Sequence, residues 1–139
     1  MKILFMCVAN SARSQLAEAL AKNIFSSSVE IESAGSEPKN VNPIGIEVLK
    51  ELGIDASKQF SKSVNQLSPR FLVDMDYVIT LCAEEVCPVL VSKAKRLHWP
   101  LPDPAGRNEL SREEQFALFR TTRDSIQEKL IAFKREIEE

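Results

Sequence analysis

The stretch KILFMCVANSARSQLAEALAKNIF, residues 2–25, joins an apolar run, a short loop of small residues and an amphipathic segment. Residues 2–8 are predicted to form a buried strand, because the run is short, apolar and bounded by turn-forming residues. Residues 14–25 are predicted to form a helix whose apolar face is Leu16, Leu20 and Ile24, with Ser11 or Ser14 as its N-cap. The stretch therefore predicts a strand that passes through a short loop into a helix.

The rest of the chain repeats this alternation of strand and helix. Further strands are expected at 29–34, 76–82 and 94–99, and helices at 43–52, at 66–74 with an interruption near Pro69, and from 111 to near the end. Ser111 and Glu114 have the spacing of a capping box at the start of the last helix. The pattern predicts an α/β fold: a single three-layer domain over residues 1–139, with a four-stranded parallel sheet and helices on both faces.

Composition limits the function classes. A chain of 139 residues suits one core, and a net charge of -2 argues against a nucleic-acid binder. No apolar stretch has the length of a membrane span or of a signal peptide, so the expected location is the cytoplasm, with no membrane partner. We expect a monomer that needs no cofactor.

Three cysteines, Cys7, Cys82 and Cys87, are the candidate reactive groups. An odd number does not describe a disulfide framework, and one histidine without a Cys-x2-Cys pair makes a poor zinc site. Cys7 and Cys82 lie at the carboxyl ends of predicted strands and Asp103 follows one, and parallel sheets bind ligands beyond the carboxyl ends of their strands. Three inert, buried thiols remain the alternative interpretation at this point.

The loop from Cys7 to Arg13 has the features of an oxyanion site. Its small residues allow backbone N–H groups to converge, the following helix adds its positive end, and Arg13 can bind a tetrahedral oxyanion through two donors. The positive electrostatic field of these groups favours the thiolate form of Cys7, which would act as a nucleophile. A structural cysteine before an exposed arginine would give the same spacing. The expected oxyanion-binding residues are Val8, Ala9, Asn10, Ser11, Ala12, Arg13 and Ser14.

The segment CVANSARSQLAEAL resembles the phosphate-binding loop of low-molecular-weight protein tyrosine phosphatases and of their relatives, the thioredoxin-coupled arsenate reductases. Asp103-Pro104 is followed by Ala105-Gly106, whereas the phosphatases usually carry an aromatic residue there. The resemblance to the reductase branch continues in order through SAG (33–35), NPIGIEVLKELGID (42–55), DYVITLC (76–82), HWPLPDPAG (98–106) and FRTTRDSIQEKL (119–130).

This resemblance implies a role in arsenic detoxification through a three-cysteine relay. Cys7 would attack arsenate, Arg13 would hold it, and Asp103 would protonate the leaving oxygen. Cys82 would then attack the sulfur of Cys7 to release arsenite, and Cys87 would close a disulfide with Cys82. Thioredoxin is the implied electron donor, with glutaredoxin or a low-molecular-weight thiol as alternatives.

Two other function classes remain open from the residues. A phosphatase that hydrolyses phosphate monoesters through a Cys7 phosphocysteine would need the loop and an acid, but neither Cys82 nor Cys87. A sensor would bind an oxyanion and signal through a disulfide without turnover. Phosphate and sulfate would compete with arsenate for the same loop in each case.

Some members of the resembled family bind potassium near the loop. Asn10, Glu18 and Ser33 match three of the ligands, and Lys62 stands where the family has an aspartate. We expect the Lys62 ammonium to occupy the cation position, and we therefore expect no metal. His98, beside Trp99, is expected to be a packing residue.

Overall fold

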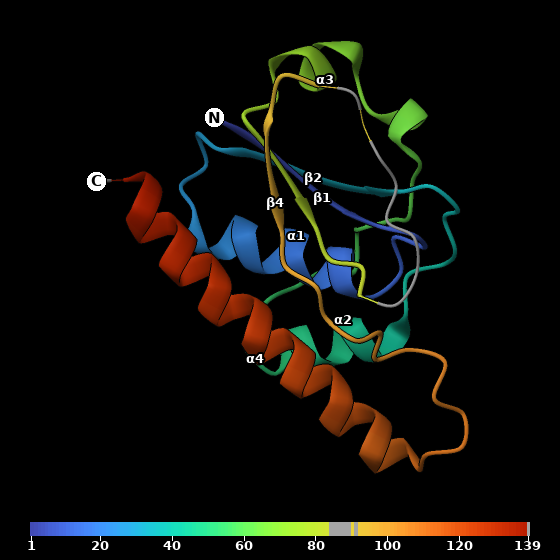
Figure 1. Ribbon diagram of the computed structural model, residues 1–139. Helices are drawn as coiled ribbons and strands as arrows, with labels where there is room; N and C mark the ends of the chain where they lie inside the picture. Colours follow the sequence, from blue (N-terminus) through green and yellow to red (C-terminus); the bar gives the residue numbers. More distant parts are fainter. Residues whose placement is uncertain (84–89, 91, 139) are drawn as a thin grey trace.

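The computed structural model describes residues 1–83, 90 and 92–138 (Figure 1). All pairings in its four-stranded sheet are parallel, in the order β2-β1-β3-β4. The strands are β1 (Lys2–Cys7), β2 (Glu30–Gly35), β3 (Tyr77–Thr80) and β4 (Lys95–His98). The helices are α1 (Arg13–Ile24), α2 (Pro43–Lys50), α3 (Pro69–Asp74) and α4 (Arg112–Ile137), with a short 3-10 helix at Val64–Gln66.

Helices cover both faces of the sheet, as the alternation of elements predicted. Figure 1 shows α1, α2 and α4 on one side and α3 on the other. Because successive side chains of a strand point to opposite faces, β1 contributes to two cores. Ile3 and Phe5 pack with α1 and α4, whereas Leu4 and Met6 pack with Phe71 of α3. The prediction of a three-layer α/β architecture is confirmed.

Two details of the helix ends differ from the prediction. The N-cap of α1 is Ala12, and no side chain caps it, because the Ser14 hydroxyl bonds to Cys7 and Asn10 instead. Pro69 begins α3 rather than interrupting a helix, since proline has no N–H to lose in the first turn. Ser68 caps that helix by accepting from the Phe71 amide. The predicted Ser111 capping box is confirmed.

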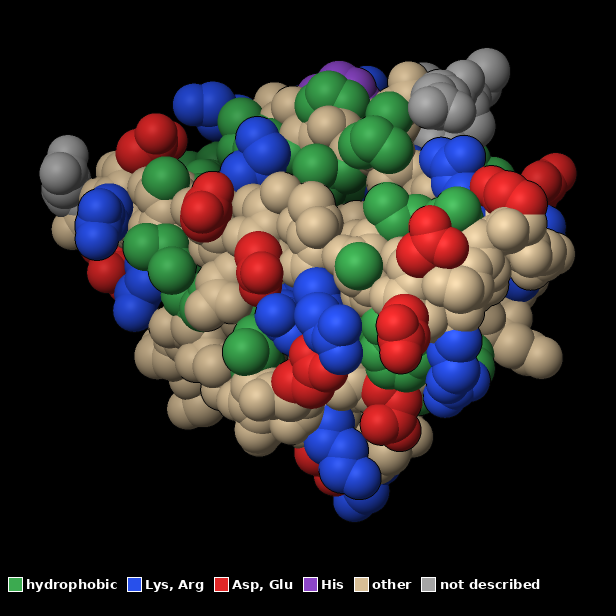
Figure 2. Space-filling model, turned by 90° about the horizontal axis from the view of Figure 1, so that it is seen from below, with side chains coloured by type: hydrophobic (Ala, Val, Ile, Leu, Met, Phe, Trp, Pro, Cys, Tyr) green, Lys and Arg blue, Asp and Glu red, His purple; other side chains and the backbone are tan. Residues whose placement is uncertain are grey.

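A charged cluster fastens α2 to the 26-residue helix α4. Arg120 binds the Glu51 carboxylate through two nitrogens, and Arg123 donates to Glu51 and to the Val48 carbonyl. Figure 2, which views the side on which these helices lie, shows basic and acidic side chains interspersed across this face. This face therefore lacks the single-sign surface typical of nucleic-acid binding.

The charged cluster predicts an acid-dependent loss of stability. Hydrogen bonds from Arg120, and then from Arg123, lower the pKa of Glu51 from 4.5 to about 2. A carboxyl whose pKa is lower in the folded state stabilises the protein above its unfolded pKa, and that contribution is lost as the pH falls through the folded pKa. Glu51→Gln should therefore lower the urea midpoint at pH 7, and the difference from wild type should shrink between pH 4.5 and pH 2.

The matched control is Glu47→Gln, one turn earlier on an exposed position of α2. It should leave the urea midpoint close to that of the wild type at both pH values. A constant difference between Glu51→Gln and wild type across this pH range would contradict the assignment.

Candidate active site

The predicted reactive groups lie after the strand ends at one edge of the sheet. Cys7 is the last residue of β1, Cys82 lies two residues beyond β3, and Asp103 lies in the loop after β4. Both described cysteines are buried, with exposures of 2% for Cys7, which is a free thiol, and 1% for Cys82, which is disulfide-bonded. Cys87 lies outside the described residues, so its predicted role remains a prediction.

The sulfur of Cys7 sits at the base of the loop and receives hydrogen bonds. The amide of Asn10 donates to Cys7 Sγ over 3.2 Å, and Ser14 Oγ lies 2.9 Å from the sulfur. Because Asn10 Nδ2 donates to Ser14 Oγ over 2.8 Å, the Ser14 hydroxyl proton is available to the sulfur. Hydrogen-bond donors and a helix N-terminus are the surroundings in which nucleophilic cysteines are found.

Asn10 organises the loop. Its φ of 49° is in the left-handed region, which asparagine tolerates better than most residues. The loop therefore makes its turn at Asn10. The Asn10 side chain also donates to Ser33 and accepts from the Lys62 amide, while its carbonyl accepts from Ser61 Oγ over 2.7 Å.

Gly35, the last residue of β2, makes room for the loop. A Cβ built on this residue would lie 2.4 Å from the Val8 carbonyl oxygen and 2.9 Å from the Asn10 amide nitrogen. Both neighbours are backbone atoms, so they cannot move aside as a flexible side chain would. The glycine of the SAG segment therefore lets β2 and the anion loop lie against each other.

Arg13 links the loop to the two other strand ends. Its Nη1 donates to the Leu101 carbonyl over 2.9 Å and approaches the Leu81 carbonyl at 3.4 Å. Its Nη2 lies 3.8 Å from Asp103 Oδ2, and the Asp103 side chain is 46% exposed. A solvent-accessible carboxyl next to this arginine has the position that a general acid would need.

Comparison with known proteins agrees with the family resemblance found in the sequence. The model of the family described as low molecular weight phosphotyrosine protein phosphatase matches residues 2–139. This chain belongs to that family. The "Arsenate reductase" of Halalkalibacterium halodurans is 41% identical over 133 residues, which cover 94% of this chain and 93% of that protein.

Solved structures of this family share the fold. "An arsenate reductase in the phosphate binding state" superposes with a TM-score of 0.78 at 31% identity, covering 98% of both chains. A thioredoxin-dependent arsenate reductase of Corynebacterium glutamicum gives a TM-score of 0.73 at 31% identity and covers 99% of this chain and 61% of that chain. The architecture of the low molecular weight phosphatase family is therefore present over the described residues.

A series of polar contacts lies behind the anion loop and extends to two lysines. Ser33 Oγ, which accepts from Asn10, donates to Glu18 Oε1 over 2.5 Å. Glu18 is buried and faces Lys22 Nζ at 2.7 Å and Lys62 Nζ at 3.5 Å. The ammonium of Lys62, whose residue is 5% exposed, thus lies beside the carboxylate and serine that the sequence matched to a cation site.

Sequence reasoning missed the segment 59–63 as part of the site, apart from Lys62. Gln59 bonds to Gln15, Gln15 donates to the carbonyls of Asn10 and Phe60, and Ser61 donates to Asn10. These residues carry amides and hydroxyls that occur in any loop, so only their position beside the anion loop reveals their role. They brace the loop from its outer side.

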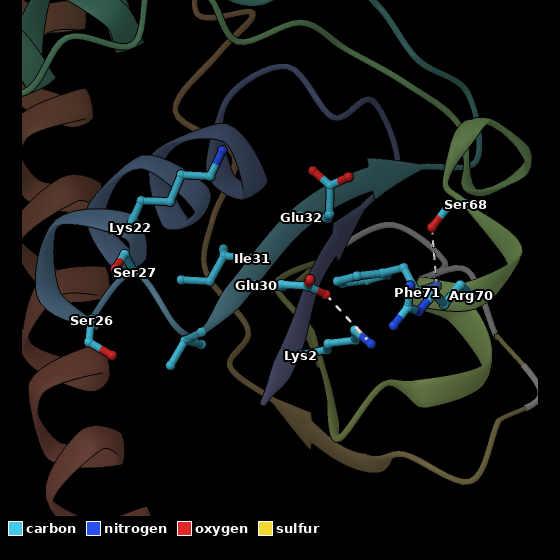
Figure 3. A pocket seen from close by; sticks show the side chains of 11 residues that line it. Lys2, Lys22, Ser26, Ser27, Glu30, Ile31, Glu32, Ser68, Arg70 and Phe71 are labelled. Carbon is cyan, nitrogen blue, oxygen red and sulfur yellow. Dashed lines mark hydrogen bonds and ion pairs between the residues drawn. The ribbon is translucent and has the colours of Figure 1, made fainter.

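A pocket of about 680 Å³ lies at the other end of the sheet and does not belong to this site. Figure 3 shows its lining at the start of β1 and β2, where Lys2 pairs with Glu30 at 3.6 Å and Phe71 forms part of the wall. Cys7 ends the strand that Lys2 begins. The Cys7 thiol therefore does not reach this pocket.

Proposed function

We propose that this protein reduces arsenate to arsenite through a relay of three thiols, with its 139 residues acting as one catalytic domain. The observation that most directly supports this proposal is the position of the Arg13 guanidinium. It lies beside the anion loop and beside the carbonyl of Leu81, the residue before Cys82. Arg13, which would hold the oxyanion, is thus next to the segment that contains Cys82, the second cysteine of the relay. The arsenate reductases among the relatives support the same substrate.

The first step attaches the oxyanion to the enzyme. Backbone amides of the loop and Arg13 would hold arsenate with its arsenic above Cys7 Sγ, and the thiolate would form a sulfur–arsenic bond. The Asp103 carboxyl would protonate the oxygen that leaves as water. Arsenic remains in oxidation state five in this covalent adduct.

The second and third steps move two electrons. The Cys82 thiolate would attack Cys7 Sγ, a disulfide would form, and the electron pair of the sulfur–arsenic bond would leave with arsenic as arsenite. Cys87 would then attack Cys82, releasing Cys7 and forming the Cys82–Cys87 disulfide. Thioredoxin would reduce that disulfide by the same exchange, consistent with the thioredoxin-dependent relative.

Hydrolysis of phosphate monoesters is the second candidate function. The anion loop, Cys7 and Asp103 would suffice for it, because water rather than Cys82 would attack the phosphocysteine. The family to which the chain belongs supports this activity. We expect it to be present as a weaker side activity, since phosphate has the same tetrahedral shape and charge as arsenate.

The test is arsenite formation from arsenate with thioredoxin, thioredoxin reductase and NADPH, followed by arsenic speciation. Parallel reactions should replace thioredoxin with glutaredoxin and glutathione, and a third set should measure p-nitrophenyl phosphate hydrolysis. Many arsenite molecules per enzyme with thioredoxin would support the relay. Hydrolysis without any arsenite would make the protein a phosphatase.

We propose further that Lys62 takes the place of a bound cation behind the loop. Its ammonium faces Glu18 Oε1 at 3.5 Å and the Phe60 carbonyl at 3.5 Å, which are oxygen ligands of the kind that potassium prefers. Wild-type turnover should therefore be the same in sodium and potassium buffers of equal ionic strength. Lys62→Asp should lower turnover in sodium and recover part of it when potassium is added.

The matched control for the cation experiment is Lys58→Asp, at an exposed position four residues before Lys62. It makes the same charge change and should respond to neither ion. Clear stimulation of the wild type by potassium would contradict the role of Lys62.

A further inference from the structure

A groove follows the outer edge of β2, the strand at one end of the sheet order. It is the pocket of about 680 Å³ at the end of the sheet away from Cys7, and its lining includes residues 29–32 of that edge. Figure 3 shows Lys22 and Ser27 of the α1 side on the left of β2, and Arg70 and Phe71 of α3 on the right. We call residues 29–32 and these two walls the edge groove.

The backbone of Ile31 points into the edge groove rather than toward β1. Glu30 N donates to the Met1 carbonyl over 2.9 Å in the pairing with β1, so the next residue, Ile31, directs its N–H and C=O to the other side. Gly35 lies on the same side as Ile31, and its N–H donates outward to the Lys62 carbonyl over 3.0 Å. Within the described residues, no backbone group pairs with the outward N–H and C=O of Ile31. An edge of this kind is a template for another strand.

The chain already extends this edge by one residue pair and then leaves it. Ser63 forms a parallel bridge with Gly35, which marks the direction in which a further strand would run. The residues before Lys62 do not continue along β2, because Ser61 donates to Asn10 and Gln59 to Gln15. The groove beside residues 29–32 is therefore left to a segment from another molecule.

Two charged side chains of the edge groove have no ion pair or hydrogen bond in the described part of the chain, the Glu32 carboxyl and the Arg70 guanidinium. The other basic groups, Lys2 and Lys22, already face carboxylates at 3.3 Å and 2.7 Å. Burial raises the pKa of Glu32, so a cation placed beside it would offset the cost of its charge. The groove thus offers one site for a basic group and one for an acidic group.

The opposite edge of the sheet is less suited to accept a strand. β4 carries the exposed basic residues Lys95 and Arg96, and charged side chains on an edge strand oppose pairing. His98, which ends β4, is also exposed, and its Nδ1 lies 2.7 Å from Thr80 Oγ1. The expectation that His98 is a packing residue is therefore wrong, although it holds for Trp99, which packs against the large core.

We propose that the edge groove binds an extended peptide segment of another protein as a fifth strand. The peptide backbone would bond to Ile31, as main-chain pairing gives affinity in strand addition. A basic and an acidic side chain, two residues apart and so on one face of the peptide, would lie beside Glu32 and Arg70. A second copy of this chain is a poor occupant, because antiparallel pairing of two β2 edges would set Glu30 and Glu32 of both copies against each other.

The experiment is a nuclear magnetic resonance titration of the whole protein with three capped peptides of alternating sequence. They are Thr-Val-Lys-Val-Glu-Val-Thr, the same peptide with Lys and Glu exchanged, and one with Gln at both positions. We expect one charged order to bind about two- to fivefold more tightly than the Gln peptide, the usual scale of cross-strand charge pairs. Binding should shift the Ile31 amide signal and slow its hydrogen exchange.

Backbone methylation tests whether the peptide binds as a strand. Successive N–H groups of a strand point to opposite sides, so N-methyl groups on one alternate set of residues should abolish binding, and on the other set should leave it intact. Equal binding of the two methylated peptides would overturn the proposal. Absence of any Ile31 shift at millimolar peptide would do the same.

Variants test the two charged contacts. Glu32→Gln and Arg70→Gln should each remove the advantage of the charged peptide, while leaving the Gln peptide bound as in the wild type. Glu128→Gln, at an exposed position of α4, is the matched control and should change neither affinity. An unchanged advantage in both groove variants would contradict the charged contacts. Dimerisation of the protein that peptide reverses would assign the groove to a second copy and overturn the proposal.

Discussion

Cys82→Ser is expected to reduce arsenite formation to the level seen without enzyme. A serine hydroxyl cannot attack Cys7 Sγ to form a disulfide, so the electron pair of the sulfur–arsenic bond cannot leave with arsenic and the adduct has no route to arsenite. The variant should still hydrolyse p-nitrophenyl phosphate at the wild-type rate, because the anion loop, Arg13 and Asp103 lie on other segments. The measurement is arsenic speciation with thioredoxin, beside a hydrolysis assay on the same preparation.

Cys87→Ser is the matched control for that experiment. It should release about one arsenite per enzyme in a single turnover and then stop, with Cys7 and Cys82 joined in a disulfide detectable by mass spectrometry. Continued turnover by Cys87→Ser would show that an external thiol resolves the first disulfide. Multiple turnover by Cys82→Ser would contradict the relay itself.

Arg13→Lys is expected to lower kcat/KM for arsenate reduction by about 100- to 1000-fold, the usual cost of removing an oxyanion donor. Lysine keeps the charge but loses the planar pair of donors that fits a tetrahedral oxyanion. It also cannot reproduce the contacts of Nη1 with Leu101 and Leu81 while Nη2 faces Asp103. Steady-state kinetics with arsenate and with p-nitrophenyl phosphate measure the effect.

Both activities should fall together in Arg13→Lys, in contrast to Cys82→Ser, because both use the same anion site. Arg135→Lys, on an exposed position of α4, makes the same chemical change away from the site and should have no effect. Loss of arsenate reduction with intact ester hydrolysis would show that Arg13 acts on the second thiol rather than on the oxyanion.

The sequence predicted the sheet because its strands have short apolar runs followed by turn formers. It also placed Cys7, Cys82 and Asp103 at the strand ends, since the topology of a parallel sheet brings those ends to one edge. The residues alone left Ser14 open as an N-cap of α1, because a serine in the first turn of a helix suits both roles, whereas the resemblance to the family implied a hydrogen bond from Ser14 to Cys7, and Ser14 Oγ does lie 2.9 Å from that sulfur. The direction of the Ser14 side chain is fixed by its contacts with Cys7 and Asn10, which only the folded loop brings together.

The same distinction applies to Gln15 and Ser61. Their chemistry is common, and each is positioned by a neighbour far away in the chain: Phe60 for Gln15 and Asn10 for Ser61. A strand or helix is encoded within a few residues, whereas a contact of this kind depends on the register of whole elements. Within the described residues 1–83, 90 and 92–138, no helix is both long and apolar enough to cross a bilayer.

The contacts of Asn10 also make catalytic competence a late event in folding. This side chain is bonded to Ser14, Ser33 and the amide of Lys62, so its neighbours span some fifty positions of the chain. Closing such distances is slow compared with forming α1 alone. A nascent chain could therefore have much of its helix content while its thiol remains an ordinary, unactivated cysteine. The full set of Asn10 contacts forms only once β2 and the segment at 61–62 have docked.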